Sequence, residues 1–268
     1  LDNPISTELS QMRPSLLPGL ISAAKRNRDR GFADGALFEL GQAYRGLGAD
    51  DQFAAASGVR FGQSSLKGAG RHWSGAAPEA GWEAVKADAL AALEALGLGQ
   101  AKVQITRDAP RWFHPGRSGA IKLGPKVTLG VFGELHPDSL ASLDADGPMA
   151  AFEIYLGNLP PAKRKSTAKP ALDASDLQAV TRDFAFLVDA ATDAGLLVRS
   201  ASSADRALIS EVSVFDEFTG QGLPDGKKSI AVEVTLQPHD KTLTEAEIDA
   251  VAEKVIAGVA KATGGTLR

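Results

Sequence analysis

The sequence is interrupted by a short segment that is poorly suited to a compact core. Residues 158–173, N-L-P-P-A-K-R-K-S-T-A-K-P-A-L-D, contain three prolines and four Lys or Arg residues, with no acidic residue before Asp173. Large apolar side chains are nearly absent, and proline together with charge favours an extended linker. The sequence therefore predicts two folding units, 1–157 and 174–268, joined by a basic linker.

The second unit has a pattern of strands and helices in the order βαββαβ. Residues 180–189 and 228–237 alternate between apolar and polar positions, as half-covered strands do, and a further strand is expected at 209–218. A short helix is expected from Asp193. A longer helix follows a Thr244–Glu247 capping box, and a short edge strand ends the chain. This order predicts a ferredoxin-like sandwich, with two helices on one face of a four-stranded antiparallel sheet.

The first unit has a mixed and less regular pattern. One helix is expected to begin between Ser15 and Pro18 and to stop at Gly31, and a second helix to carry Trp82 and Leu93. An antiparallel sheet with flanking helices is the economical interpretation, so both units together give an α+β chain. The strands are expected at 35–45, 54–63, 101–107, 118–123, 127–134 and 149–156.

The composition excludes several classes of function. The chain has no cysteine, which excludes disulfides, thiolate metal sites and cysteine nucleophiles, and it favours a reducing compartment such as the cytoplasm. No apolar run approaches the roughly 18 residues needed to span a membrane, and the first residues lack the features of a signal peptide. Because the chain starts at Leu1 rather than at methionine, we expect it to be a fragment.

The residues that could carry catalysis or bind a metal are dispersed. The four histidines do not form a ligand cluster with Asp or Glu, so no metal site is expected. For His114 and His136, which both precede proline, a role in fixing loops is favoured over acid–base catalysis. The segment 68–75, G-A-G-R-H-W-S-G, lacks the signature of a phosphate-binding loop and is interpreted as a surface loop. The basic run 25–30 is interpreted as a solvated helix end in preference to a phosphate contact. The histidines are His72, His114, His136 and His239.

The segment 215–229, F-D-E-F-T-G-Q-G-L-P-D-G-K-K-S, is expected to form a hairpin that ends in two lysines. Residues 172–268 hold 9 Lys or Arg against 16 Asp or Glu, a net charge of −7. A broad polyanion-binding surface is therefore not expected in the second unit, and any contact with a nucleic acid should be local.

Several stretches resemble the β subunit of bacterial phenylalanyl-tRNA synthetase, in collinear order along essentially the whole chain. The resemblance covers about the C-terminal third of that subunit. It is carried by N-P-I-S-T-E-L-S-Q-M-R-P-S-L-L-P-G-L (3–20), L-F-E-L-G-Q-A-Y (37–44), W-F-H-P-G-R-S-G (112–119), G-V-F-G-E-L-H-P (130–137), V-T-R-D-F-A-F-L-V-D (180–189), V-F-D-E-F-T-G-Q-G-L-P-D-G-K-K-S-I-A (214–231), K-T-L-T-E-A-E-I (241–248) and the final L-R.

The resemblance implies that the first unit is a class II synthetase-like domain without catalytic function. The arginines and glutamate that class II enzymes use to bind ATP cannot be assembled from this sequence, so no catalytic residue and no metal ligand is assigned. ATP and Mg²⁺ would belong to the holoenzyme, whose active site lies in the α subunit of an (αβ)₂ assembly. Met12, Arg13, Leu16, Leu17 and the strand 37–44 would then serve as scaffold or as the subunit interface, and the family's editing domain is not in this chain.

The resemblance also implies that the second unit is a ferredoxin-fold anticodon-binding domain for the phenylalanine tRNA. Basic and aromatic side chains on its exposed face would contact phosphates and unpaired bases, with help from the basic linker. For Lys228 an alternative is that its stem packs over the core as an edge lysine. The candidate residues are Arg182, Phe215, Lys227, Lys228 and Arg268.

Two other functions are compatible with the residues alone. One is a free-standing class II-like ligase that activates an amino acid with ATP. The other is a regulatory protein whose ferredoxin-like unit binds a small effector.

Overall fold

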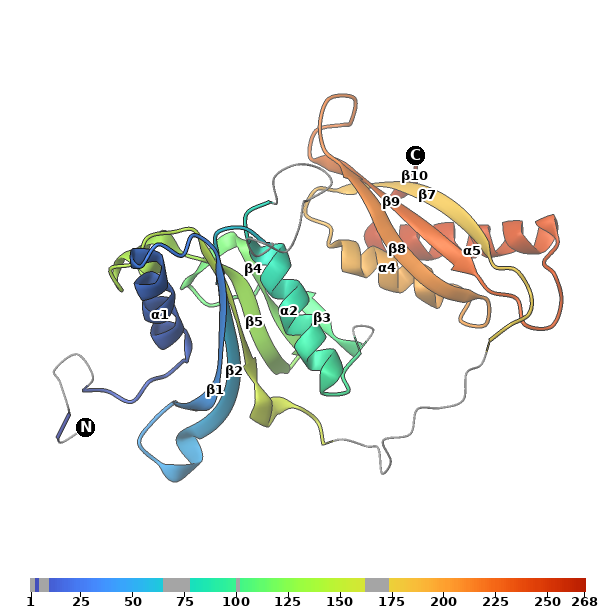
Figure 1. Cartoon of the computed structure of the whole chain (residues 1–268). Helices are drawn as coiled ribbons and strands as arrows, with labels where there is room; N and C mark the ends of the chain where they lie inside the picture. The colour runs from blue at the N-terminus through green and yellow to red at the C-terminus, as the bar shows by residue number, and fades with distance from the viewer. Residues whose placement is uncertain (1–2, 5–9, 65–77, 100–101, 162–173) are drawn as a thin grey trace. The chain divides into compact units, whose positions relative to one another are not determined.

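The computed structural model describes residues 3–4, 10–64, 78–99, 102–161 and 174–268 (Figure 1). Its contacts divide the chain into two compact units, Leu1–Lys165 and Ser166–Arg268, each with its own hydrophobic core. The division falls inside the segment interpreted as a linker, of which residues 162–173 lie outside the described part. The loop expected at 68–75 also lies outside it.

Unit 1 is built on a six-stranded antiparallel sheet in the order β1-β2-β6-β5-β4-β3. A short helix, α3, was not expected from the sequence, although Pro137 and Asp138 are typical of a helix start. In chain order its helices and strands are α1 (Leu17–Asp29), β1 (Gly35–Tyr44), β2 (Gln52–Phe61), α2 (Trp82–Ala95), β3 (Gln104–Thr106), β4 (Phe113–Leu123), β5 (Val127–Leu135), α3 (Pro137–Ala141) and β6 (Met149–Tyr155).

One long helix packs on each face of this sheet. Successive residues of a strand point to opposite faces, so on β6 Met149 and Ala151 pack with α1, whereas Ala150 and Ile154 pack with α2. The chain leaves α1 through Gly31, whose φ of 92° favours glycine. The helix α1 buries one stripe of residues at helical spacing, made of Leu17, Leu20, Ile21 and Ala24.

Unit 2 has the predicted ferredoxin-like arrangement of two helices on a four-stranded antiparallel sheet. The strand order is β10-β7-β9-β8, which puts the first and third strands in the centre. The two helices pack against each other and on one face of the sheet, and the opposite face is open (Figure 1). The elements are β7 (Val180–Asp189), α4 (Ala194–Ser203), β8 (Ile209–Phe218), β9 (Lys227–Leu236), α5 (Glu245–Thr263) and β10 (Thr266–Leu267).

The core of unit 2 follows the predicted alternation. On β9, Ile230, Val232 and Val234 are buried against the helices, while Ala231 and Glu233 are partly exposed on the open face. The predicted capping box is confirmed, because Glu247 N–H donates to Thr244 Oγ1 at 3.3 Å and Thr244 N–H donates to Glu247 Oε2 at 2.9 Å. The helix it starts, α5, contributes Ile248, Val251, Val255 and Val259 to the core.

The predicted boundaries differ from the structure in a few places. The strand expected at 101–107 is reduced to the three residues of β3, of which Gln104 and Ile105 are exposed, and residues 100–101 lie outside the described part. The strand expected at 118–123 begins earlier, because β4 pairs with β5 from Phe113 across a register shift. Among the helices that the structure describes, none is long and apolar enough to cross a membrane.

Candidate functional site

The five side chains predicted to contact RNA lie on both sides of the unit 2 sheet. The pairing of β7 with β9 places Arg182 opposite Val234 and Lys228 opposite Val188, and both partners belong to the helix-covered core. Lys227 pairs with Asp189 and therefore lies on the open face. The structure thus separates the five residues instead of gathering them into one cluster.

Arg182 lies on the helix side, near the start of α5. Its guanidinium Nη2 is 3.4 Å from Glu245 Oε2, and 41% of its side chain is exposed. An ion pair this open contributes little to stability. The guanidinium is consequently free to exchange its partner for another anion at the rim of the sheet.

Lys228 is the most enclosed of the five residues. Only 7% of the residue is exposed, and its Nζ lies 3.5 Å from Glu217 Oε1. This geometry matches the alternative weighed from the sequence, in which the lysine stem packs over the core and the ammonium reaches the edge. Lys228 therefore offers less charge to a ligand than its neighbour Lys227.

Lys227 stands at the open-face end of β9. Its Nζ donates to Asp189 Oδ1 at 2.6 Å, and 65% of that aspartate side chain is exposed. The hairpin that precedes it turns through Gly226, whose φ of 75° favours glycine. The turn fixes Lys227 at one end of the open face, where its partner is accessible to solvent.

Arg268 and Phe218 meet on the open face of unit 2. Arg268 N–H donates to Ala185 O at 2.8 Å, which holds the end of the chain against β7. Its guanidinium carbon lies 5.8 Å from the centre of the Phe218 ring, a cation–π arrangement. The sequence analysis did not select Phe218, although it stands in the same F-D-E-F motif as Phe215. Two-residue alternation from Val212 and Val214 would have placed it on the helix side, so the signal that could have identified it is its place in this motif.

Phe215 is exposed because the strand is irregular at its position. The register of β8 against β9 shifts between Val214 and Asp216, so Phe215 is the extra residue of a bulge. It is 58% exposed, more than Phe218 at 39%. The bulge also places Asp216 and Phe218 on the open face, because Asp216 pairs with Ala231 and Phe218 with Ser229.

The open face does not have a uniform charge. Asp183 pairs directly with Glu233 across β7 and β9, and two carboxylates in this position repel a phosphate chain. Lys227, Arg268 and Phe218 lie toward the other end of these strands. We call that end the Phe218 end and define it by these three residues; Asp189, the partner of Lys227, and Asp216 also lie there.

The described histidines of unit 1 act within their own loops. His114 Nδ1 accepts a hydrogen bond from Gly116 N–H at 3.1 Å, and His136 Nδ1 accepts one from Asp138 N–H at 3.2 Å at the start of α3. The predicted role in fixing loops is confirmed for both. Within the described ranges, no three His, Asp or Glu side chains are grouped so that they could hold a metal.

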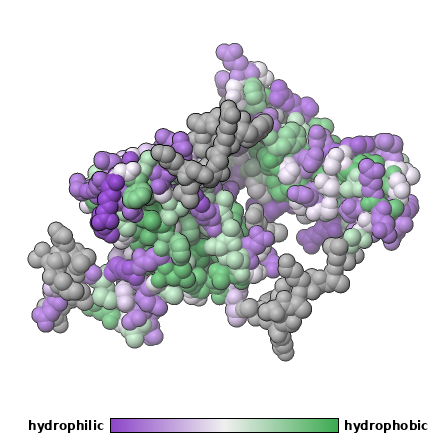
Figure 2. Space-filling model, viewed as in Figure 1, coloured by the Kyte–Doolittle hydropathy of each residue, from purple (hydrophilic) through white to green (hydrophobic). Residues whose placement is uncertain are grey.

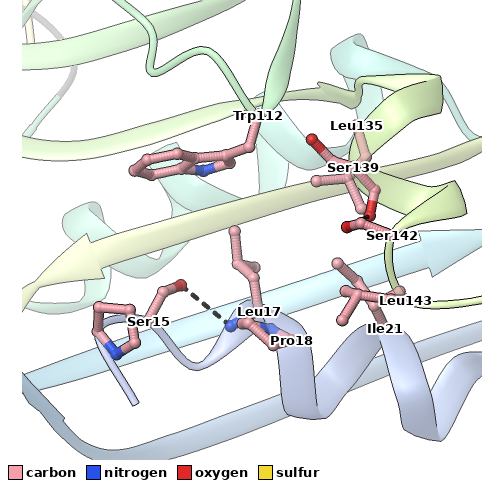
Figure 3. A pocket seen from close by; sticks show the side chains of 10 residues that line it. Ser15, Leu17, Pro18, Ile21, Trp112, Leu135, Ser139, Ser142 and Leu143 are labelled. Carbon is pink, nitrogen blue, oxygen red and sulfur yellow. Dashed lines mark hydrogen bonds between the residues drawn. The ribbon is translucent and has the colours of Figure 1, made fainter. Parts of the chain in front are cut away.

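Unit 1 has an apolar pocket beside the start of α1 (Figure 3). Its volume is about 300 Å³, and the indole of Trp112 lies across it from Leu17 and Pro18. None of the described residues that line it carries a charge. ATP phosphates need cationic or amide donors, so these residues do not fit ATP. The lining residues are Pro14, Ser15, Leu17, Pro18, Ile21, Trp112, Leu135, Ser139, Ser142 and Leu143.

A second hollow of unit 1, of about 650 Å³, is more polar but has the wrong charge for a nucleotide. Its one described arginine, Arg117, pairs with Glu134 at 3.1 Å, and Glu79 and Glu83 also line it. Two further carboxylates beside a neutralised pair repel phosphates. The described residues that line these two hollows thus do not fit ATP.

The segment predicted to be scaffold or interface is held against the sheet by buried leucines and by an exposed ion pair. Leu16 and Leu17 are buried, and Arg13 Nη1 is 2.6 Å from Glu39 Oε1 on β1. Met12 is 38% exposed. These contacts connect the start of α1 and the chain before it to the sheet, and the choice between scaffold and subunit interface stays a prediction.

Comparison with known proteins gives matches along the whole chain. Residues 1–156 match the model of the phenylalanyl-tRNA synthetase β chain CLM domain, and residues 175–268 match that of the ferredoxin-fold anticodon binding domain. A pyrrolysyl-tRNA synthetase structure, Desulfitobacterium hafniense PylSc, aligns with 55% of this chain and 46% of that chain at 16% identity. Its TM-score is 0.40, too low to support an argument.

Proteins called phenylalanine–tRNA ligase beta subunit are similar over the full length of this chain. That of Brucella suis biovar 1 (strain 1330) is 55% identical over 269 residues, covering 100% of this chain and 34% of the relative. That of Bradyrhizobium diazoefficiens is 55% identical over 267 residues, covering 99% and 33%. This chain spans about a third of the length of the curated relatives it matches. The CLM-domain model matches residues 1–156, more than half of this chain, so the chain belongs to the phenylalanyl-tRNA synthetase β-chain family.

Proposed function

We propose that this chain is part of the β subunit of a phenylalanine–tRNA ligase, and that unit 2 holds the anticodon stem-loop of the phenylalanine tRNA. The observation that carries the proposal is the ferredoxin-fold anticodon-binding match over residues 175–268. The pair Phe218–Arg268 on the open face of that unit supports it, because it joins an aromatic ring and a cation at one exposed point.

The contacts with RNA divide between bases and phosphates. Phe218 stacks on an unpaired base, and Arg268 and Lys227 contact the phosphates on either side of it. Phe215 offers a second exposed ring at the bulge. Arg182 and Lys228 lie on the helix side of the sheet. From the rim of the sheet they attract the RNA phosphates at long range, and they do not contact bases.

Unit 1 serves assembly with the catalytic α subunit. Its described pockets do not fit ATP, so ATP and Mg²⁺ act in the α subunit, and we propose no catalytic residue in this chain. The assembly is an (αβ)₂ heterotetramer in the cytoplasm. Phenylalanine is activated by α, and the β chain orients the tRNA.

The test uses the complete enzyme, with Phe218→Ala and Arg268→Ala in the β subunit. Each variant should raise the KM for tRNA several-fold and leave phenylalanine-dependent pyrophosphate exchange unchanged. Glu211→Ala, an exposed change on the same edge strand, is the control. An equal loss in both assays would indicate a folding defect, and no change in either variant would refute the anticodon role.

Two further assays separate this proposal from the other functions. Pyrophosphate exchange by the purified 268-residue chain alone would establish a free-standing ligase. A rise in melting temperature with one member of an amino-acid panel would establish an effector-binding protein, because a ligand that prefers the folded state stabilises it. We expect neither result.

A further inference from the structure

One half of the unit 1 sheet has an apolar face that the described residues leave uncovered. Phe38 and Leu40 on β1 are 78% and 66% exposed. Pairing places Phe38 beside Gly58 of β2, and Gly58 beside Phe152 of β6, so these residues lie on the same face as α2. We call this surface the Phe38 face and define it by Phe38, Leu40, Ala56, Gly58 and Phe152.

The helix α2 is too narrow to cover this face. It packs on residues of β4, β5 and β6, and Arg60 of β2 reaches it through a two-bond ion pair with Asp88, at 2.6 and 2.9 Å. A helix is about 10 Å wide and strands are about 4.8 Å apart, so one helix covers roughly two strands. As far as the described residues show, the half of the sheet formed by β1 and β2 therefore has room for one more helix beside α2.

The space-filling view supports this interpretation. Hydrophobic residues gather in one continuous area over β1, β2 and α2 (Figure 2). A groove of about 210 Å³ runs there, between Phe38 on the strand and Asp88 on the helix, with Phe152 also in its lining. Folded proteins rarely expose large contiguous apolar surfaces to water, and such surfaces mark interaction sites.

The edge strand β1 is covered at one end, where Tyr44 N–H donates to Arg13 O and Arg13 Nε donates to Gln42 O, both at 2.9 Å, but it has few of the other features that protect an edge. The other edge strand of comparable length, β8, has two register shifts and the charges Glu211, Asp216 and Glu217. The remaining edges, β3 and β10, have three and two residues. In contrast, β1 pairs with β2 over ten residues without a shift, and its one charged residue, Glu39, is paired with Arg13.

We infer that a helix from the part of the β subunit outside these 268 residues packs on the Phe38 face beside α2. The chain spans about a third of the length of its relatives, and this inference rests on the proposed function, in which the rest of a β subunit of that length would supply the helix. A sheet needs a covering layer on each apolar face for its domain to fold, which favours an occupant from the same chain over a partner that binds after folding. The helix would carry an apolar stripe toward Phe38 and Leu40.

The experiment compares cysteine labelling at Leu40→Cys in the 268-residue chain and in the full-length β subunit without α. The 268-residue chain has no cysteine of its own, and peptide mass spectrometry identifies the labelled site in the longer protein. We expect labelling at position 40 to be at least about tenfold slower in the full-length subunit. Leu47→Cys, at a 99% exposed position beyond the end of β1, is the control and should label equally fast in both.

Hydrogen exchange of the unsubstituted proteins gives the same comparison without a mutation. Residues 36–42 should exchange more slowly in the full-length subunit alone. Equal rates in both proteins would overturn the inference, as would protection that appears only after α is added. Slow labelling in the 268-residue chain alone would also overturn the inference, whether that chain has the mass of a monomer or of a dimer. These outcomes do not depend on whether the enzyme binds tRNA, so the inference and the proposed anticodon role of unit 2 can fail separately.

Discussion

The carboxylate of Glu153 on β6 accepts a hydrogen bond from the Leu16 amide nitrogen at 2.9 Å, across 137 residues of sequence. The same oxygen, Oε1, accepts from Ser15 Oγ at 2.9 Å and from Ser57 Oγ on β2 at 3.0 Å. Glu153 is 1% exposed. One buried carboxylate thus joins the start of α1 to two central strands, and its negative charge suits the N-terminal end of the helix.

The first prediction follows from this junction. Glu153→Ala leaves three donors without an acceptor inside the protein, and we expect it to lower the free energy of unfolding of unit 1 by about 3 kcal/mol. Glu153→Gln should lower the free energy of unfolding less, because the amide oxygen of glutamine can still accept a hydrogen bond. Chemical unfolding monitored by tryptophan fluorescence measures the change, because all three tryptophans, Trp73, Trp82 and Trp112, belong to unit 1.

The control for this junction is Glu94→Ala, an exposed glutamate of α2 in the same unit. It should change stability by less than about 0.5 kcal/mol. A Glu153→Ala protein as stable as the Glu94→Ala protein would show that Glu153 does not hold α1 in place.

The second prediction separates stacking from charge at the Phe218 end. Phe218→Ala should weaken tRNA binding by about 1–3 kcal/mol without changing its dependence on salt, because a base stack releases no counterions. Arg268→Gln should reduce the slope of log affinity against log salt by about 0.7–0.9, the value of one phosphate contact. Binding of labelled tRNA to the complete enzyme at several salt concentrations measures both. Equal slopes for Arg268→Gln and the unsubstituted enzyme would contradict the phosphate contact.

The third prediction compares two adjacent lysines. Lys227→Ala should raise the KM for tRNA more than Lys228→Met does, because the Lys227 ammonium lies on the open face and Lys228 is 7% exposed on the helix side. Methionine keeps the apolar stem of Lys228 and removes its charge. Aminoacylation kinetics and the melting temperature of both variants are the measurements. A larger KM effect for Lys228→Met, with an unchanged melting temperature, would assign the contact to Lys228.

The fold of unit 2 could be predicted because its sequence patterns are local and regular. The even-numbered positions of β9 are apolar from Ile230 to Leu236, and the Thr244–Glu247 box fixes where α5 begins. The face that each candidate occupies was harder to predict. The bulge at Phe215 changes which side chains of β8 reach the open face, and a bulge depends on pairing between strands rather than on the strand itself.

In unit 1, too, the strands could be predicted better than the contacts between them. The strands β1, β2, β5 and β6 were predicted, but the roles of Glu153 and Phe38 were not. Glu153 belongs to a strand that is otherwise apolar, and its donors lie 96 to 138 residues away along the chain. The exposure of Phe38 depends on which strands α2 covers. Both features arise from tertiary packing, so no short stretch of sequence contains them.

The last prediction concerns acid stability at the start of α5. Hydrogen bonds from Lys241, and from the backbone and side chain of Thr244, hold the pKa of Glu247 at about 2, below its ordinary value of 4.5. Because the pKa is lower in the folded state, this group stabilises unit 2 fully above pH 4.5, and the contribution is lost as the pH falls through about 2. Glu247→Gln should therefore lower the melting temperature of unit 2 at pH 7 and reduce its further fall between pH 4.5 and 2. The control is Glu253→Gln, at an exposed position of the same helix. If Glu247→Gln and the unsubstituted chain lose stability equally over this range, the carboxylate of Glu247 does not support the cap.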